Sequence, residues 1–294
     1  MTLKMARQGG NWQGRFTAMA SPCEILLEVE QEPEARLLCE AAETEARRIE
    51  TKFSRYRDAN IVHALNNSAG RPVTVDDETA DLLDFAHRCH EISDGRFDVT
   101  SGVLRQIWKF DGSEKVPSRK QAKALLPLVG WSKITWRRPE VIVPDGMEID
   151  LGGLGKEYAV DKVATLLADR TTAPMLVNFG GDLRALGRRA DGRSWQVGVE
   201  LPGISDTAGL KLELGVGALA TSGDARRFLL RNGIRYPHIL NPLTGWPVMR
   251  APRSVTVLGD TCTEAGLLAT LAMLHGDRAE VFLAEQGVKN WVMR

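Results

Sequence analysis

The sequence predicts an α+β fold with largely antiparallel sheets and flanking helices. Two observations carry this prediction. Strand-like and helix-like segments are interspersed along the 294 residues. The strand-like segments over residues 175–221 follow one another at hairpin spacing, without the helix that a parallel βαβ unit needs between its strands. We expect a single domain over residues 1–294, in which residues 1–15 are irregular.

Hydrophobic periodicity places the elements along the chain. Helices are predicted over residues 33–53, 76–92, 118–126, 157–169, 262–274 and 277–286. Strands are predicted over residues 16–30, 132–136, 140–144, 146–151, 175–179, 183–188, 194–200, 210–215, 216–221, 236–240, 253–258 and 288–293. Asp76 or Asp77 caps the second helix, which ends near Asp94-Gly95, and Ser118 caps the third.

The charge balance excludes several classes of function. Lysine plus arginine equals aspartate plus glutamate at 38 each, so there is no electrostatic basis for binding nucleic acid or an anionic membrane. No run of about 18 apolar residues is present to span a membrane. The N-terminal segment has no apolar signal-peptide core and no lipobox-like cysteine, which favours a cytoplasmic protein.

The cysteines do not form a recognisable metal or redox motif. Cys23, Cys39, Cys89 and Cys262 are widely spaced, and no pair has the C-x-x-C spacing of a zinc ribbon or a redox centre. We therefore expect free, buried thiols in a reducing compartment.

The most informative segment is IDLGGLGKEYAVD, residues 149–161. An acidic residue ends an apolar run, a glycine-rich turn follows, and a helix then begins. Glycines at such a turn let the backbone come close to a phosphate or a metal. Asp150 is placed to meet a hydroxyl, an amine or a cation. A tight turn with a solvated carboxylate explains the same residues without a ligand.

Two earlier segments have the composition of nucleotide-binding loops. In residues 52–66, two arginines flank Tyr56, a pattern that suits stacking on a flat ring and holding a phosphate. The alternative is an amphipathic helix end followed by a solvated turn. Residues 93–108 form a loop of glycines and hydroxyl residues that can present backbone N–H groups to an anion. Within it, Phe97 and Trp108 are also plausible core anchors.

Two later segments are also rich in turn residues. Gly180 and Gly181, within residues 178–187, separate two apolar strands, and a hairpin turn explains them without a function. His238 lies between a strand and a turn, a position that suits proton transfer. A lone histidine is more often structural, and His238 gains weight only from the glycine-rich turns near it in the sequence.

Taken together, these segments resemble the ApbE family of flavin transferases, the FAD:protein FMN transferases. The resemblance runs from residue 19 to about residue 276. The matching pieces are AMASPCEI, KFSRYRDANIVHALN, GRFDVTSGVLRQIW, IDLGGLGKEYAVD, NFGGDL, ATSGDARRF, YPHILNPLTGWPV and SVTVLGDTCTEAGLLATLAML. Each piece is modest alone, but eight in the right order make a chance match improbable.

The resemblance implies an ApbE-like (T-fold-like) architecture and a specific reaction. Such enzymes split the pyrophosphate of FAD and transfer FMN, through its phosphate, to a Ser or Thr hydroxyl of an acceptor protein. AMP leaves, and a divalent cation, usually Mg²⁺, lies near the pyrophosphate. The implied acceptor is a flavoprotein or a redox subunit. This chemistry needs positioning and charge neutralisation more than covalent help from the enzyme.

Motif matching assigns a role to nine residues. His238 matches the family's catalytic histidine, the base for the target hydroxyl. The backbone oxygen of Gly153 and the hydroxyl of Thr270 would face the metal. Contacts to FAD are expected from Met19, Phe97, Asp98, Asp150, Lys156 and Ile239, the last beside the flavin nucleotide.

The chain departs from the family pattern at the metal. Gly266 stands where the family's closing helix has a metal-binding aspartate, and Glu157 stands where a glycine is common. Asn241 replaces a common aspartate. Glu264 is near Gly266, but residues 261–264 have a capping-box pattern that would use this glutamate on the backbone. Loss of the anionic ligand predicts a weaker magnesium site.

These departures leave other functions open. A protein that binds or delivers FAD without transferring FMN would tolerate the loss of the aspartate. An FAD pyrophosphatase would release FMN to water. A structural protein with glycine turns alone is the remaining alternative, and it would not bind FAD.

Overall fold

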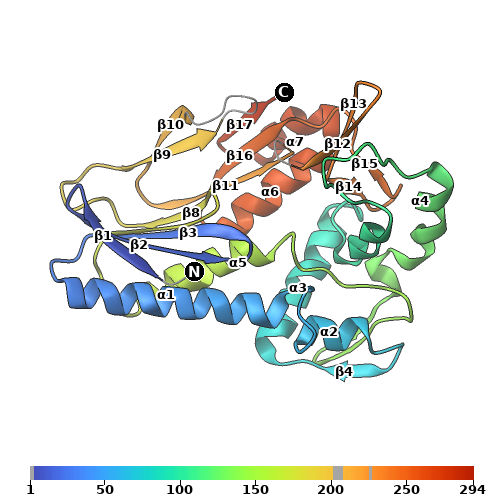
Figure 1. The fold of residues 1–294 in the computed structure, drawn as a ribbon, viewed down its shortest axis with the longest axis horizontal. Helices are drawn as coiled ribbons and strands as arrows, with labels where there is room; N and C mark the ends of the chain where they lie inside the picture. Colours follow the sequence, from blue (N-terminus) through green and yellow to red (C-terminus); the bar gives the residue numbers. More distant parts are fainter. Residues whose placement is uncertain (1–2, 201–207, 225–226) are drawn as a thin grey trace.

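An antiparallel sheet of eight strands is the centre of the molecule (Figure 1). The computed structural model describes residues 3–200, 208–224 and 227–294. The strand order is β1-β2-β3-β7-β8-β11-β16-β17, and every neighbouring pair is antiparallel. The strands are β1 (Lys4–Gln8), β2 (Asn11–Ala18), β3 (Ser21–Leu27), β7 (Met175–Phe179), β8 (Asp182–Leu186), β11 (Gly217–Gly223), β16 (Ser254–Gly259) and β17 (Asn290–Met293). The predicted α+β class is confirmed.

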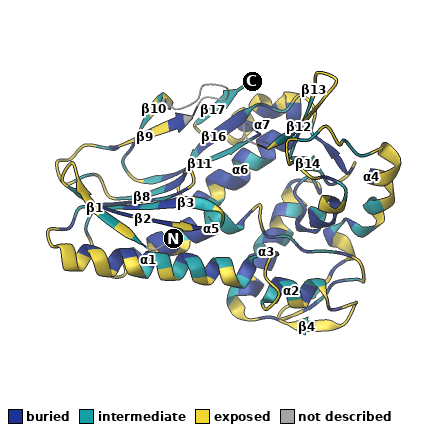
Figure 2. Cartoon of the chain, in the orientation of Figure 1, coloured by how far each residue is buried: buried dark blue, intermediate teal, exposed yellow. Residues whose placement is uncertain are grey.

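Helices pack on this sheet through their apolar faces. Helix α1 (Glu32–Phe53) packs on β2 and β3, α5 (Gly155–Ala168) on β7 and β8, and α6 (Cys262–Leu274) on β11 and β16. Helix α7 (Ala279–Gln286) packs on α6. In α1, buried residues recur every three or four positions, and the other side is exposed to solvent (Figure 2).

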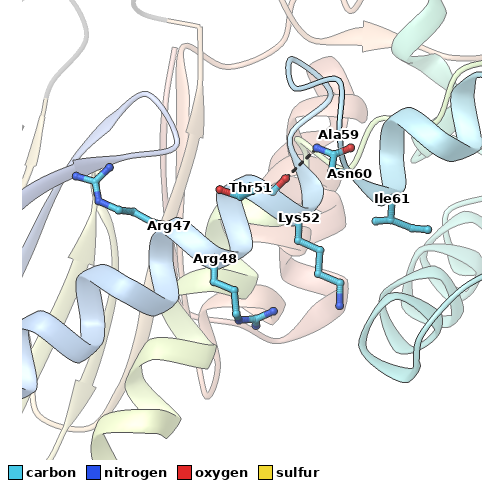
Figure 3. A pocket seen from close by; sticks show the side chains of 7 residues that line it. All are labelled: Arg47, Arg48, Thr51, Lys52, Ala59, Asn60 and Ile61. Atoms are coloured by element: carbon cyan, nitrogen blue, oxygen red, sulfur yellow. Dashed lines mark hydrogen bonds between the residues drawn. The ribbon is translucent and has the colours of Figure 1, made fainter.

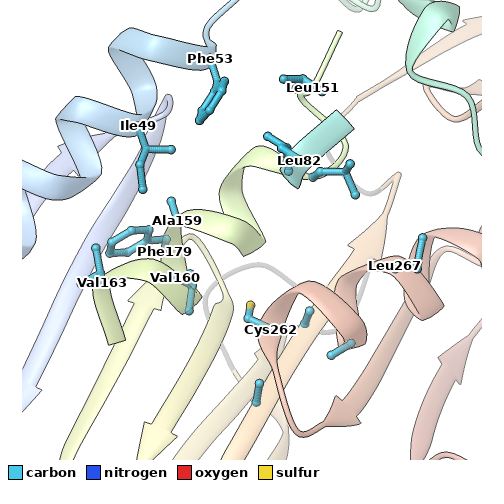
Figure 4. Close-up of a cluster of buried hydrophobic side chains, with 14 of the residues drawn as sticks. Ile49, Phe53, Leu82, Leu151, Ala159, Val160, Val163, Phe179, Cys262 and Leu267 are labelled. Carbon is cyan, nitrogen blue, oxygen red and sulfur yellow. The ribbon is translucent and has the colours of Figure 1, made fainter. Parts of the chain in front are cut away.

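The core lies between these helices and the sheet. Ile49 of α1, Val160 of α5, Leu267 of α6 and Phe179 of β7 all belong to it (Figure 4). Side chains alternate between the two faces of the sheet, so residues next to Phe179 and Val177 along β7 point to the face opposite these helices. On that face, Leu176, Leu183 and Leu219 form a second cluster with the hairpin of β9 (Trp195–Glu200) and β10 (Ala208–Leu214).

Two long excursions leave the sheet and lie together at one of its ends (Figure 1). Residues 28–174 connect β3 to its neighbour β7. Apart from α1 and α5, they contain α2 (Ile61–Asn66), β4 (Pro72–Thr74), α3 (Asp77–Ile92), the 3₁₀ helix η1 (Val99–Gln106), α4 (Arg119–Leu125), η2 (Leu126–Leu128), η3 (Trp131–Lys133), β5 (Thr135–Arg137) and β6 (Glu140–Ile142).

The second excursion connects β11 to β16. It contains two hairpins, β12 (Phe228–Arg231) with β13 (Ile234–Pro237) and β14 (Leu240–Asn241) with β15 (Trp246–Pro247). The two excursions share a third apolar cluster, in which Trp108 contacts Trp246 at a ring separation of 4.9 Å. The Trp108 indole N–H donates to the carbonyl of Gly245 at 2.9 Å, so its predicted role as a core anchor is confirmed.

The predicted helix starts agree with the structure. Asp76 caps α3 by accepting the N–H of Thr79, and Ser118 caps α4 in a reciprocal capping box with Gln121. Thr261 caps α6, while the Glu264 carboxylate accepts the N–H of Asp260 at 3.3 Å. The predicted use of Glu264 on the backbone is therefore confirmed, one residue earlier than a standard capping box.

The N-terminal prediction is wrong in two respects. The supposedly irregular residues 1–15 contain β1 and most of β2, with residues 1–2 outside the described part. The single strand predicted over 16–30 is two strands joined by a tight hairpin. Met19 and Ala20 adopt left-handed φ values of 50° and 53° at the turn. Neither residue is a glycine or asparagine, so the usual sequence signal for such a turn is missing.

Other boundaries shift for local reasons. The strand predicted over 236–240 is interrupted, because β13 ends at Pro237 and β14 begins at Leu240. The helix predicted from residue 277 begins with a 3₁₀ turn, η4 (Gly276–Arg278). The four cysteines are free and buried, as expected. Among residues 3–200, 208–224 and 227–294, no helix is both long and apolar enough to cross a membrane.

We predict that Glu78 makes the fold sensitive to acid. Arg48 and Lys52 of α1 and the Tyr158 hydroxyl of α5 all contact its carboxylate, at 2.6 to 3.0 Å. Arg48 first, and then Lys52 and Tyr158, lower the pKa of Glu78 to about 2 against the opposing effect of burial. Because the folded-state pKa is depressed, this stability is present above the ordinary value of 4.5 and lost as pH falls toward 2.

Glu78→Gln should therefore lower the free energy of unfolding at pH 7 by about 1–2 kcal/mol, allowing for solvent screening. It should also flatten the pH dependence between about 4.5 and 2, as measured by denaturant titration at several pH values. Glu280→Gln, which removes a surface carboxylate paired with Arg294, is the control. Identical acid profiles for wild type and Glu78→Gln would contradict the prediction.

Candidate active site

The turn over residues 149–155 leads into α5 without the predicted strand over 146–151. The side chain of Asn66 takes the place of a neighbouring strand. Its Nδ2 donates to the Ile149 carbonyl at 3.0 Å, and the Ile149 N–H donates to its Oδ1 at 2.7 Å. The N–H of Asp150 then donates to the carbonyl of Val99 at 2.7 Å. The turn is thereby tied both to α2 and to the start of η1.

Asp150 divides its carboxylate between the backbone and an arginine. Oδ1 accepts the N–H of Gly152 at 2.9 Å, and Oδ2 lies 2.5 Å from Arg55 Nη1. A Cβ at Gly102 would lie 2.7 Å from Asp150 Cβ, so the close approach of η1 requires glycine there. The guanidinium of Arg55 also lies 5.0 Å from the exposed ring of Tyr56. A cation and an aromatic face therefore stand together beside Asp150.

Lys156, in the first turn of α5, forms an ion pair with a buried aspartate. Its Nζ lies 2.7 Å from Oδ2 of Asp182, the first residue of β8, whose side chain is only 1% exposed. Oδ1 of Asp182 accepts the N–H of Thr221 at 3.1 Å. Burial alone would lower the pKa of Lys156, but the charge and hydrogen bond of Asp182 raise it, so the ammonium stays charged.

Two turns lie beside this ion pair. The N–H of Gly180 donates to the carbonyl of Pro22, which follows the Met19 hairpin, at 2.9 Å. Gly180 has a φ of +61°, and a Cβ there would lie 2.9 Å from the side chain of Ser21 and 3.8 Å from Lys156 Nζ. The β2–β3 turn, the β7–β8 turn and Lys156 are therefore neighbours at one end of the sheet.

Phe97 and Asp98 are buried where η1 begins. The Phe97 ring lies against Gly153, since a Cβ on that glycine would be 3.6 Å from it. Asp98 caps η1 by accepting the N–H and hydroxyl of Thr100, at 2.8 and 2.6 Å. Its other oxygen accepts the N–H of Trp131 at 2.8 Å and lies 3.2 Å from His90 Nδ1. The Asp98 carboxylate thus holds the loop together, and its predicted contact with FAD stays a prediction.

His238 follows β13, as expected for a residue between a strand and a turn. Its N–H donates to the carbonyl of Arg227 at 3.2 Å, and its ring meets Phe110 edge-on at 6.2 Å. Ring atom Nδ1 is buried and has no hydrogen-bond partner in the part of the chain that the structure describes. Burial, reinforced by the charge of Arg227, lowers the pKa of His238 below its ordinary 6.5, which favours the neutral imidazole. The next residue, Ile239, packs against the main core.

The residues predicted to face a metal come from two facing helices. Gly153 lies just before α5, and Thr270 is one turn beyond Gly266 on α6. The Glu157 side chain covers Gly266, because a Cβ on that glycine would lie 2.5 Å from Glu157 Cγ. Among the described residues, no group of three or more His, Cys, Asp and Glu side chains is arranged to hold a metal ion. A cation here would need carbonyl, hydroxyl, phosphate or water oxygens as well.

A surface hollow of about 470 Å³ lies elsewhere, along the C-terminal half of α1 (Figure 3). It is lined by Arg47, Arg48, Thr51, Lys52, Ala59, Asn60 and Ile61. Arg48 and Lys52 share the Glu78 carboxylate, and Asn60 Nδ2 donates to the carbonyl of Thr51. These contacts hold α1 against α3 and against the loop before α2.

The structure brings most of the site residues predicted from the sequence to neighbouring turns. Phe97, Asp150 and Gly153 meet at one turn, and Met19 and Lys156 flank the neighbouring pair of turns. His238 and Ile239 come from the second excursion. Sequence reasoning did not assign roles to Asp182 or Asn66, and it considered Arg55 only as one of the two arginines beside Tyr56. Each lies inside a matching motif, but its partner is distant in sequence, so local patterns could not identify the contact.

Comparison with known proteins agrees with this arrangement. The model of the ApbE family matches residues 19–292. An FAD:protein FMN transferase from Vibrio cholerae is 30% identical over 244 residues, covering 81% of this chain and 73% of that protein. The crystal structure of the ApbE protein from Thermotoga maritima superimposes with a TM-score of 0.87 at 31% identity, covering 96% of this chain and 94% of that one.

A second solved structure, the apo form of the flavinyl transferase ApbE from Pseudomonas stutzeri, gives a TM-score of 0.84 at 26% identity. It covers 100% of this chain and 93% of the other. The match therefore extends through the sheet and both excursions, including the turns that carry Asp150, Lys156 and His238. By sequence and by fold, this chain belongs to the ApbE family.

Proposed function

We propose that this protein is an FAD:protein FMN transferase. It cleaves the pyrophosphate of FAD and attaches FMN, through its phosphate, to a Ser or Thr hydroxyl of an acceptor protein, and AMP leaves. The observation that carries the proposal is the family match over residues 19–292, together with a 30% identical relative that is named for this activity. FAD is the substrate, and the acceptor is a flavoprotein or redox subunit of the cytoplasm.

The cations at the glycine-rich turns suit a pyrophosphate. Lys156 stays charged beside Asp182, and Arg55 is held in place by Asp150. A side chain already fixed by an ion pair loses little entropy when it binds a phosphate oxygen. The N-terminus of α5 adds backbone N–H groups with partial positive charge. Met19, Phe97, Asp98 and Ile239 are proposed to contact the rest of FAD.

His238 suits the role of general base. A neutral imidazole accepts the proton of the Ser or Thr hydroxyl as that oxygen attacks phosphorus. The lowered pKa keeps the ring neutral at pH 7, and no described residue hydrogen-bonds to Nδ1 and competes for a proton. The ring is also held from one side by the edge contact with Phe110.

The donor set fits magnesium. The Gly153 carbonyl and the Thr270 hydroxyl are hard oxygen ligands, and magnesium keeps several waters and substrate phosphates in its shell. The side chain of Glu157, in the first turn of α5, lies over Gly266 of α6, one turn before Thr270. Magnesium, when bound, would neutralise charge that builds up on the phosphate oxygens.

A transfer assay tests the function directly. Incubation with FAD, Mg²⁺ and a candidate acceptor should add the mass of FMN to the acceptor and release one AMP per transfer, as measured by intact mass and chromatography. Free FMN without acceptor would instead identify an FAD pyrophosphatase. FAD bound with no AMP released would identify a delivery protein, and both outcomes would contradict the proposal.

Removal of the His238 imidazole should slow FMN transfer without weakening FAD binding. His238→Asn should slow transfer by at least about 100-fold, because the attacking hydroxyl loses its proton acceptor. FAD affinity, measured by fluorescence quenching, should stay within about twofold of wild type. His63→Asn, on the exposed side of α2, is the control. In the wild type, the rate should fall only as pH drops below 6.5, since the pKa of His238 is lowered. A transfer rate for His238→Asn close to wild type would exclude this role.

Asp150→Asn should weaken FAD binding more than folding. The amide can still accept the N–H of Gly152, but it no longer holds Arg55 by charge. We expect a loss in FAD affinity of about tenfold, from the hydrogen bonds that a misplaced guanidinium loses. The thermal midpoint should change by less than about 3 °C, because the hydrogen bond from the Gly152 N–H survives and the ion pair is only partly buried. Unchanged FAD affinity would contradict the proposed position of Asp150.

A further inference from the structure

Helices α5 and α6 face each other in antiparallel register. Asp161 of α5 accepts the N–H groups of Cys262 and Thr263, at 2.9 and 2.8 Å, at the start of α6. One turn earlier on α5 is Glu157, and one turn later on α6 is Gly266, which lies under the Glu157 side chain. Thr270 lies one turn beyond Gly266 on α6, and Gly153 lies in the turn that leads into α5, four residues before Glu157.

Glu157 has a carboxylate without a full set of partners. Its Oε2 is buried and has no hydrogen-bond partner among residues 3–200, 208–224 and 227–294, although the residue as a whole is only partly buried. The nearest cation along the helix, Lys156, is engaged by Asp182 at 2.7 Å. A buried carboxylate oxygen that lacks a partner is costly. The structure therefore leaves a carboxyl oxygen available between α5 and α6.

We propose that Glu157 supplies the anionic oxygen ligand for the divalent cation, from the space that Gly266 leaves open, alongside the Gly153 carbonyl and the Thr270 hydroxyl. The proposal rests on the proposed function and names a ligand of the same site. It explains two departures from the family pattern as one exchange. The acidic side chain moves from α6 to α5, and the small residue moves from α5 to α6.

Steric contact links the two positions. A Cβ at residue 266 would lie 2.5 Å from Cγ and 3.0 Å from Oε1 of Glu157, so both acidic side chains cannot occupy this space without displacement. Glutamate is one methylene longer than aspartate, which gives it the reach to cover Gly266 from the opposite helix. Glu264, the acidic residue nearest Gly266 in sequence, already accepts the N–H of Asp260 and does not fill the role.

The test is a Mn²⁺ titration of the FAD-free protein, in which electron paramagnetic resonance measures the free ion. Wild type should bind one Mn²⁺ per chain. Glu157→Gln should weaken binding by at least about tenfold, since an anionic ligand is lost. It should fold normally, because the amide has nearly the same shape. Glu264→Gln, which removes a charge on the first turn of α6, should bind like wild type.

Exchange of the two residues gives the sharper result. Gly266→Asp alone should displace Glu157 and lower the thermal midpoint, whereas the double variant Glu157→Gly with Gly266→Asp should restore Mn²⁺ affinity to within about threefold. A Glu157→Gln variant that binds Mn²⁺ like wild type would overturn the proposal. So would a wild type that binds none, or a double variant that binds no better than Glu157→Gln.

The transfer assay keeps this inference apart from the proposed function. Transfer of FMN by a wild type whose Mn²⁺ affinity does not depend on Glu157 would overturn the ligand and leave the activity. Mn²⁺ binding that depends on Glu157, without transfer to any acceptor, would count against the activity and leave the ligand.

Discussion

The Asp161 carboxylate fixes the register on which the site depends. It caps α6 through two backbone N–H groups and the Thr263 hydroxyl, and it also pairs with Arg184 of β8 at 2.9 Å. One side chain thereby joins two helices and the sheet. A negative charge at a helix N-terminus is favourable, and its low exposure strengthens the interaction. With this register set, every residue one turn away on α5 has a fixed neighbour on α6.

The carboxyl groups near Asp161 differ in how many hydrogen-bond and ion-pair partners they have. Asp182 has Lys156 and the Thr221 N–H as partners, and Asp150 has Arg55 and the Gly152 N–H. These pairs hold Lys156 and Arg55 in place, and neither carboxylate is left unpaired in apolar surroundings. Glu157 is different, because burial first, and then the neighbouring Asp182, raise its pKa to about 8. Its buried Oε2 also has no hydrogen-bond partner among the described residues.

Sequence reasoning identified what depends on local pattern. The amphipathic helices, the caps at Asp76 and Ser118, and the position of His238 after a strand all follow from residues close together in the chain. It failed where a distant side chain takes over a backbone role. Asn66 pairs with Ile149 and so removes the strand predicted over 146–151, and no local periodicity contains that information.

The same limit explains the metal position. In the sequence, Gly266 is a lost ligand and Glu157 is an unrelated change in a turn, so together they indicate a weakened site. The structure shows that the two residues occupy one space between facing helices. The acidic side chain that is missing at Gly266 on α6 is therefore matched by the acidic side chain of Glu157 on α5. Loss of a ligand at one position of a motif therefore indicates loss of the site only if no facing residue fills the space that it leaves.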